Sequence, residues 1–255
     1  MKIYRFKHNK TIRYGLLEED RLIPLQRSVL GNLREKKQKI PIGDVIILPP
    51  VLPTKIVGIG RNYKEHADER GQRVPERPLI FLKPPSAVIG TNDIIIYPDD
   101  TKRLDYEGEL ALVVGKKVWK LEKDAPVKDF ILGYTCLNDV TARDLQDKDG
   151  QWTRAKSFDT FAPIGPCIAM DLDPSRLKVK TFLNGKLRQS GNTANMIFPV
   201  PELIRYVSQI MTLMPGDIIT TGTPPGVGPM FPGDRVDVQI DGIGTLSNTV
   251  MRIKK

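Results

Sequence analysis

The sequence predicts a mixed α+β fold that is made mostly of β-strands. Short segments in which apolar and polar residues alternate recur along the chain, and glycine or proline separates most of them. Glycine and proline contribute 21 residues each to the 255, which indicates many turns. Helical spacing is confined to the segments 62–70, 201–212 and a stretch that starts at Thr141. The length predicts one large domain with a small appendage.

The first 48 residues predict a group of short strands, over 2–6, 14–17, 21–25 and 45–48. The stiff segment Pro49–Pro53 then breaks the pattern. We therefore expect a small N-terminal domain over residues 1–50 and a larger domain over 53–253.

The larger domain continues the strand pattern, over 55–59, 79–82, 93–97, 104–114, 217–221, 235–240 and 244–253. The segment 62–70 predicts a short helix that Gly71 ends. The apolar run 130–140 leads into the helix from Thr141, where Thr141 and Asp144 would form a capping box.

Composition and charge exclude several classes of protein. The formal net charge is +9, but the basic residues are spread along the chain, and the densest run is residues 34–39. Without a nucleic-acid-binding signature, this charge predicts a solvated basic surface that attracts small anions, and no nucleic-acid partner. The chain shows neither a signal peptide nor an apolar stretch long enough to cross a bilayer, so we expect a cytoplasmic protein without a membrane partner. Cys136 and Cys167 form no zinc or redox motif and are expected to be buried free thiols.

Two acids in the longest predicted strand give the strongest chemical signal. Glu107 and Glu109 are two residues apart, so both side chains point to one face of the strand. That face would be solvent-exposed with ordinary acids, or a cation would sit between the carboxylates. Ala111 and Val113 continue the same face and indicate partial burial, while Gly108 is typical of a close approach by another group. A hard divalent cation, Mg²⁺ or Mn²⁺, would relieve the repulsion between the acids.

A third acid, Asp139, ends the apolar run before the predicted helix. It would cap that helix, or it would join the two glutamates as an oxygen ligand. Arg143 and Gln146 are three residues apart, on one face of the same helix. Together with a cation, they would hold the carboxylate of a substrate.

Of the two histidines, only His66 has a neighbour that suggests catalysis. Glu69 lies one helical turn further on, where its carboxylate would hydrogen-bond the imidazole and raise its basicity. The pair would act as a general base toward water, or the segment would be a surface helix of mixed charge.

The glycine-rich segment 222–228 follows a predicted strand and would present backbone N–H groups to an anion. It is not a Walker loop, and Gly58-Ile59-Gly60 lacks the third glycine of a dinucleotide fingerprint. The chain has no GxSxG segment, which argues against a serine hydrolase.

Taken in order, seven segments of the chain resemble the fumarylacetoacetate hydrolase superfamily. They are GIGRNYKEHADERG (58–71), PLIFLKPPSAVIG (78–90), LDYEGELALVVGK (104–116), GYTCLNDVTARDLQ (133–146), RAKSFDTFAPIGP (154–166), MIFPVPELIRYVS (196–208) and PGDIITTGTPPGVGP (215–229). They cover most of residues 53–250. The resemblance is strongest to small members: acylpyruvate hydrolases, oxaloacetate decarboxylases and the isomerase/decarboxylases of the homoprotocatechuate pathway.

The resemblance implies a mixed β-roll, a homodimer, and a small N-terminal domain. It implies Mg²⁺ or Mn²⁺ on Glu107, Glu109 and Asp139, and a catalytic pair, His66 and Glu69, on a segment that folds over the site. It assigns a catalytic role to Lys156. The positions that line the family's substrate pocket correspond here to Lys83, Arg143, Gln146 and Thr223.

Two departures from the family pattern stand out. Some members carry a fourth acidic ligand shortly before the histidine, whereas the first acid after position 58 here is Glu65, next to His66. Three carboxylates would leave about three positions of an octahedral ion for water and substrate. Asn195 stands where relatives often carry Asp or Ser.

The resemblance and the acids together predict an enzyme that cleaves a C–C bond of a small anionic 2-oxo or β-diketo acid. The reaction would be acylpyruvate hydrolysis or oxaloacetate-type decarboxylation, through an enolate that the divalent ion stabilises. His66 with Glu69 would activate water, and Lys156 would stabilise the developing charge. One alternative is 2-hydroxyhepta-2,4-diene-1,7-dioate isomerase/decarboxylase activity in aromatic catabolism. A remote alternative is a non-catalytic basic binding protein, which would leave the three acids unexplained.

Overall fold

The computed structural model describes residues 1–26, 38–69, 71 and 73–253. Within these residues the strands form one sheet of 12 strands, one of five and one of three, and helices are few and short. The predicted α+β fold with mostly β structure is confirmed. Of the basic run 34–39, residues 34–37 lie outside the described residues, as does Arg70 at the end of the predicted first helix.

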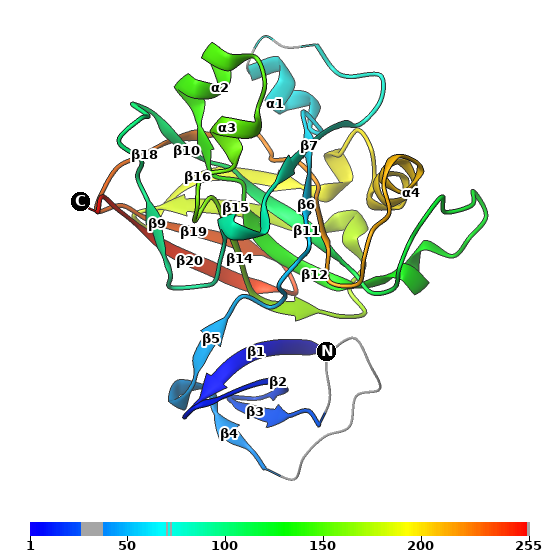
Figure 1. Cartoon of the computed structure of the whole chain (residues 1–255), viewed down its shortest axis with the longest axis vertical. Coiled ribbons are helices and arrows are strands. Elements are labelled where there is room, and N and C mark those ends of the chain that lie inside the picture. Colours follow the sequence, from blue (N-terminus) through cyan, green and yellow to red (C-terminus); the bar gives the residue numbers. More distant parts are fainter. Residues whose placement is uncertain (27–37, 70, 72, 254–255) are drawn as a thin grey trace.

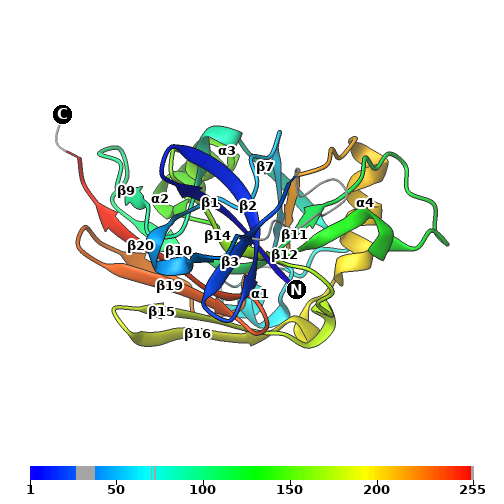
Figure 2. The ribbon, with the colours of Figure 1, turned by 90° about the horizontal axis from the view of Figure 1, so that it is seen from below.

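The N-terminal strands form a group at one end of the molecule (Figure 1), and seen from below they lie in front of the main body (Figure 2). They are β1 (Lys2–His8), β2 (Thr11–Glu18), β3 (Arg21–Pro24), β4 (Ile40–Pro41) and β5 (Ile46–Leu48). β1 also pairs with β14 (Ala162–Ala169), with Lys2 opposite Ala169, so these strands extend the large sheet.

The main body contains the rest of the large sheet and the two smaller sheets. From β14 the large sheet runs through β12 (Ile131–Asn138), β11 (Gly108–Val114), β17 (Ile218–Thr220), β6 (Ile56–Gly60) and β7 (Leu79–Lys83), with β8 (Val88–Ile89) on β14. The five-stranded sheet has the order β16 (Lys186–Asn192), β15 (Lys178–Leu183), β19 (Arg235–Ile240), β20 (Gly244–Met251) and β9 (Ile94–Ile96). The three-stranded sheet has β13 (Thr141–Ala142), β10 (Leu104–Tyr106) and β18 (Gly228–Met230). The pairs β6–β17, β8–β14 and β9–β20 are parallel, so the large and the five-stranded sheets are mixed.

Both faces of β11 are buried. Leu112 packs in the same apolar cluster as Val238 of the five-stranded sheet, while Val113 packs in a second cluster with Ile164 on the other side. The strand therefore has no solvent-exposed face, and the acids at its start lie in the interior of the protein. A solvated strand face, one of the two interpretations of the acid pair, is wrong.

Three helices, α1 (Lys64–Glu69), α2 (Arg143–Asp149) and α3 (Thr153–Lys156), gather at the end of the main body away from the N-terminal strands (Figure 1). The longest helix, α4 (Val200–Ile210), lies at the side of the main body and buries Leu203, Ile204 and Val207. Short 3₁₀ turns are η1 (Ile42–Asp44), η2 (Pro85–Ala87), η3 (Val127–Phe130), η4 (Pro174–Arg176) and η5 (Thr193–Asn195). Among the described residues, none of the helices combines the length and the apolar character that a membrane span requires.

Two predicted elements differ from the structure near the acids. The strand predicted over 104–114 is two strands in two sheets, β10 and β11, and the chain changes sheet at Glu107. The helix predicted from Thr141 begins at Arg143, and its N-cap residue, Ala142, makes no side-chain hydrogen bond. Thr141 Oγ1 donates to the carbonyl oxygen of Asp139, and Asp144 accepts hydrogen bonds from residues 101 and 102. The Thr141 hydroxyl thus bonds two residues back along the chain, and Asp144 bonds to residues far away in the sequence, so the predicted capping box is wrong.

The strands β14, β15 and β16 were not predicted. The hairpin β15–β16 turns at Asn184 and Gly185, which both have positive φ, and Asn-Gly is the strongest two-residue hairpin signal. β14 contains Pro163 and Pro166, which in sequence indicate a break rather than a strand. The two thiols are free and buried as expected, and burial raises the pKa of Cys167 to about 11.

Candidate active site

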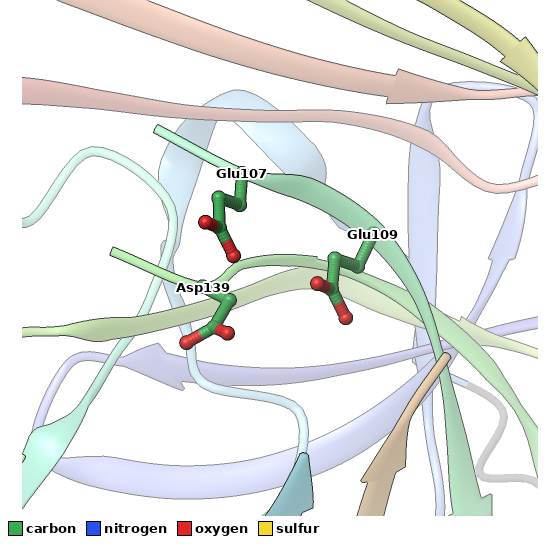
Figure 3. Close-up of side chains that lie close together, drawn as sticks. All are labelled: Glu107, Glu109 and Asp139. Atoms are coloured by element: carbon green, nitrogen blue, oxygen red, sulfur yellow. The ribbon is translucent and has the colours of Figure 1, made fainter. Parts of the chain in front are cut away.

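Three carboxylates converge in the interior of the main body, where β10 ends, β11 begins and β12 ends. Glu107 joins β10 to β11, Glu109 is the second residue of β11, and Asp139 directly follows β12. One oxygen from each lies within 4.8 Å of the others, and the three residues are only 5%, 2% and 1% exposed. Figure 3 shows the three carboxylates pointing toward one another.

Strand register brings these acids together. Gly108 pairs with Asn138 across β11 and β12, so the residues that flank this pair lie side by side. The backbone N–H of Glu107 donates to Asn138 Oδ1 at 2.9 Å, and the N–H of Asp139 donates to the Glu107 carbonyl oxygen at 2.8 Å. A Cβ atom at Gly108 would lie 2.1 Å from Thr181 Oγ1, which explains why a glycine separates the two glutamates.

Three buried cations surround the acids. Lys156 Nζ lies 2.8 Å from Glu107 Oε2 and 2.5 Å from Asp139 Oδ2. Lys83 Nζ lies 2.5 Å from the other oxygen of Asp139. Arg143 donates through Nη2 to Glu107 Oε1, through Nε to Asp105, and through Nη1 to Gln146 Oε1 at 2.6 Å. Such pairing is what makes buried charges tolerable.

The surroundings shift the pKa values of Glu107 and Glu109 in opposite directions. Burial favours the neutral form of Glu107, but Lys156 and Arg143 outweigh it and hold its pKa well below the usual range. Burial and the nearby charges of Asp139 and Glu107 raise the pKa of Glu109 well above the usual range. Although burial opposes its charge, Asp139 and Glu107 also raise the pKa of Lys156, which keeps this side chain an ammonium ion.

The donor set of the acid cluster fits a hard divalent cation. It offers only carboxylate oxygens, which Mg²⁺ and Mn²⁺ prefer. A positive ion among these oxygens would also offset the repulsion that raises the pKa of Glu109, because it would favour the charged form of all three acids.

The predicted catalytic pair lies on α1. His66 is buried in this short helix, and its Nδ1 is 3.7 Å from Glu69 Oε2, beyond hydrogen-bond distance. The side chain of His66 is 8% exposed and that of Glu69 is 45% exposed. The helix therefore turns the histidine inward and leaves the glutamate at the rim, where Glu69 Oε2 accepts a hydrogen bond from the N–H of Gly226 at 3.1 Å.

A cavity of about 210 Å³ connects α1 to the acid cluster. Predicted site residues on its wall are His66, Glu107, Glu109, Asp139, Arg143, Gln146, Lys156 and Thr223. Lys83, which was expected to line the substrate pocket, is fully buried behind Asp139 and also donates to the Val140 carbonyl oxygen. The geometry thus places Lys83 against a carboxylate of the cluster, outside the cavity wall.

The glycine-rich segment 222–228 does present N–H groups to acidic side chains, but these belong to the chain itself. Gly222 donates to Glu109 Oε2 at 2.9 Å, and Gly226 donates to Glu69. Thr223 Oγ1 donates to the carbonyl oxygen of Gly108 and accepts from Gln189. The segment therefore ties the acid cluster to the rim of the cavity.

Asn195 and Glu65, the two departures from the family pattern, contact each other. Asn195 Nδ2 donates to Glu65 Oε1 at 3.3 Å on the exposed surface. Glu65 is therefore directed away from the acid cluster, and it does not supply a fourth carboxylate there.

Sequence reasoning missed one side of the cavity, formed by Arg61, Phe81 and Trp152. The two glycines of β6, Gly58 and Gly60, were the features of the sequence that could have indicated it. A Cβ atom at either position would lie within 2.5 Å of an aromatic ring. Gly58 faces the ring of Phe81, and Gly60 faces the ring of Trp152.

Comparison with known families matches almost the whole chain. Residues 55–251 match the family described as Fumarylacetoacetate (FAA) hydrolase C-terminal, and residues 1–50 match the one described as Rv2993c-like, N-terminal. Oxaloacetate tautomerase YisK of Bacillus subtilis is 45% identical over 236 residues, which are 88% of this chain and 76% of that protein.

Solved structures show the same fold at full length. The 2-hydroxyhepta-2,4-diene-1,7-dioate isomerase from Mycobacterium marinum has a TM-score of 0.92 at 40% identity, with both chains covered over 100% of their length. Maleylpyruvate hydrolase from Sphingobium, in complex with manganese(II) and pyruvate, has a TM-score of 0.83 at 30% identity, also over 100% of both chains.

Proposed function

The chain belongs to the fumarylacetoacetate hydrolase family, and we propose that it is a divalent-metal-dependent enzyme that moves a proton between carbon and oxygen in a small 2-oxo acid. The reaction would be a keto–enol tautomerisation or the closely related isomerisation of a dienol. One observation carries this proposal: a single cavity holds the acid cluster, the buried His66 and the ammonium group of Lys156.

Glu107, Glu109 and Asp139 would hold Mg²⁺ or Mn²⁺. The manganese and pyruvate in the maleylpyruvate hydrolase complex support this ion and a 2-oxo acid ligand. When bound, the ion would supply Lewis-acid stabilisation of negative charge on the substrate.

Lys156 would stabilise the oxygen on which negative charge develops. Asp139 and Glu107 favour its charged form, which suits it to act as a cation and not as a base. An ammonium group already in place costs no reorganisation when the charge develops. Arg143, Gln146 and Thr223, on the same wall, would orient the polar groups of the substrate.

His66 would carry the proton. Its imidazole lies on the cavity wall, and an imidazole exchanges protons readily near neutral pH. It would take a proton from the carbon next to the keto group and return it to oxygen, or the reverse. Glu69, 3.7 Å from Nδ1, would stabilise the protonated ring.

C–C bond cleavage, the reaction expected from the sequence, is the second candidate. The pairing of His66 with Glu69 favours it, since the same pair would deprotonate a water molecule for attack on a distal carbonyl. The maleylpyruvate hydrolase, which shares the fold at 30% identity, also supports it. The similarity to the tautomerase, at 45% identity, supports proton transfer as the first candidate.

An NMR experiment in D₂O with Mg²⁺ distinguishes the candidates. The protein would be offered oxaloacetate, acetylpyruvate and a dienol dicarboxylate, with EDTA as the control. We expect EDTA-sensitive deuterium exchange at C3 of oxaloacetate without loss of carbon. EDTA-sensitive formation of pyruvate with acetate or CO₂ would instead establish cleavage, and no reaction with any substrate would contradict both.

A further inference from the structure

Arg61 is a cation on the cavity wall for which neither the fold nor the acid cluster supplies a partner. Arg143 and Lys156 are bound to acids, whereas within the described residues Arg61 contacts no carboxylate. Its Nε is buried and makes no hydrogen bond there. A buried donor without an acceptor is costly, so a ligand in the cavity that accepted a hydrogen bond from Nε would remove this cost.

Two aromatic side chains, Trp152 and Phe81, form the wall next to Arg61. The guanidinium carbon lies 5.8 Å from the ring centroid of Trp152, and that ring packs edge-on against Phe81 with a centroid distance of 5.4 Å. The Trp152 ring reaches the backbone because Gly60 has no Cβ. An aromatic face attracts a cation without satisfying its N–H donors, which leaves those donors to a ligand.

The backbone of Arg61 is also specialised. Its φ is +57°, in the left-handed region that non-glycine residues adopt rarely and at some cost. Asn62, the next residue, fixes the turn through side-chain hydrogen bonds with the backbone of Phe198 and Thr221. The strained residue thus lies between a glycine that admits Trp152 and an asparagine that anchors the loop.

We propose that Arg61 binds the distal carboxylate of a 2-oxo dicarboxylic acid and thereby selects dicarboxylates over 2-oxo acids that end in an alkyl group. This inference rests on the proposed function, which places the 2-oxo acid end of the substrate at the acid cluster. A guanidinium offers two parallel N–H donors, and a carboxylate is the acceptor that matches them. Arg143, already bonded to Asp105, Glu107 and Gln146, has fewer donors to offer.

The test compares two substrates that differ only at the distal group. Oxaloacetate carries a C4 carboxylate where 2-oxobutanoate carries a methyl group, and C3 deuterium exchange with Mg²⁺ is followed for both by NMR. We expect Arg61→Met to lower kcat/KM for oxaloacetate about 100-fold, as when one partner of a buried charge pair is removed. The kcat/KM for 2-oxobutanoate should stay within about threefold of the wild-type value. Arg61→Lys should recover part of the loss. Arg176→Met, at an exposed position in η4, is the matched control and should behave as wild type.

A binding arm separates this inference from the proposed function. Calorimetry with Mg²⁺-loaded protein compares malate with 2-hydroxybutanoate, which differ in the same way and do not enolise. The inference is supported if wild type binds malate more tightly than 2-hydroxybutanoate and Arg61→Met removes this preference. This holds even if wild type catalyses deuterium exchange in neither 2-oxo acid, so that the proposed function fails. The inference would be overturned if Arg61→Met lowered kcat/KM equally for both substrates or affinity equally for both ligands, or if it lowered neither. It would also be overturned if wild type did not bind malate.

Discussion

The ammonium nitrogen of Lys156 lies 2.5 Å from Asp139 Oδ2, in the interior of the protein. A carboxylate proposed as a metal ligand therefore shares a buried contact with the cation proposed to stabilise the substrate. Because the same nitrogen also contacts Glu107, one side chain links two of the three acids to the reacting end of the cavity.

Lys156→Met should separate metal binding from turnover. Removal of the ammonium takes a positive charge away from two metal ligands, so Mn²⁺ affinity in calorimetry should stay equal or rise. Activity should fall by about 100-fold or more, since the developing charge loses its donor. A variant that loses Mn²⁺ binding would show that Lys156 is needed to build the metal site, and would contradict this assignment.

Glu107 and Glu109 should respond differently to the same change in metal-free protein. Glu107→Gln removes one of the two carboxylates that pair with each of two buried cations, Lys156 and Arg143, so we expect a loss of about 3–5 kcal/mol in the free energy of unfolding. Burial and the neighbouring acids favour the protonated form of Glu109, so Glu109→Gln should change stability by no more than about 1 kcal/mol. Urea unfolding in EDTA measures both. Equal losses would mean that the two acids carry the same charge.

Binding of the ion should release a proton from Glu109. The pKa of Glu109 is raised in the folded metal-free protein, so the native state holds a proton that the unfolded chain has lost. Its contribution to metal-free stability is therefore full at low pH and falls as pH rises from the ordinary carboxyl pKa through the folded one. Mn²⁺ affinity should rise with pH over the same window, by up to about tenfold per unit. Calorimetry in two buffers of different ionisation enthalpy detects the proton, and identical heats in both would refute its release.

His66→Ala should abolish catalysis and spare the ion. The imidazole is not a member of the acid cluster, so Mn²⁺ affinity should be unchanged. The rate of proton exchange should fall about 10²–10⁴-fold, the usual contribution of a positioned acid or base. Glu69→Gln, which keeps a polar side chain at the rim, should lose less. Exchange at the wild-type rate in His66→Ala would assign the proton transfer to another group.

Local pattern was enough to find the acids, because alternation in a strand and the end of an apolar run are properties of neighbouring residues. Pattern could not show that the chain changes sheet at Glu107, since both β10 and β11 read as strand and their partners lie far away in the sequence. Thr141 and Asp144 have the spacing of a capping box, but long-range hydrogen bonds engage Asp144 instead. The long-range hydrogen bonds of Asp144 therefore override the local capping pattern.

The rest of the site depends on contacts that spacing does not encode. Lys83 and Lys156 are 73 positions apart and meet at Asp139, so their location relative to the cavity could not be read from either segment. Gly58 and Gly60 indicated close packing in β6, but nothing near Arg61 identified its aromatic neighbour, because Trp152 lies far away in the sequence, at the N-cap of α3. The roles carried over from the family resemblance, unlike these positions, stay predictions.

The central claim is that Glu107, Glu109 and Asp139 hold one divalent ion. Mn²⁺ titration of metal-free protein, followed by the EPR signal of the free ion, tests it in wild type and in Glu109→Gln, with Glu65→Gln as the control at an exposed acid nearby. We predict one ion per chain in wild type and in Glu65→Gln, and a loss of binding in Glu109→Gln. Undiminished binding in Glu109→Gln would contradict the claim.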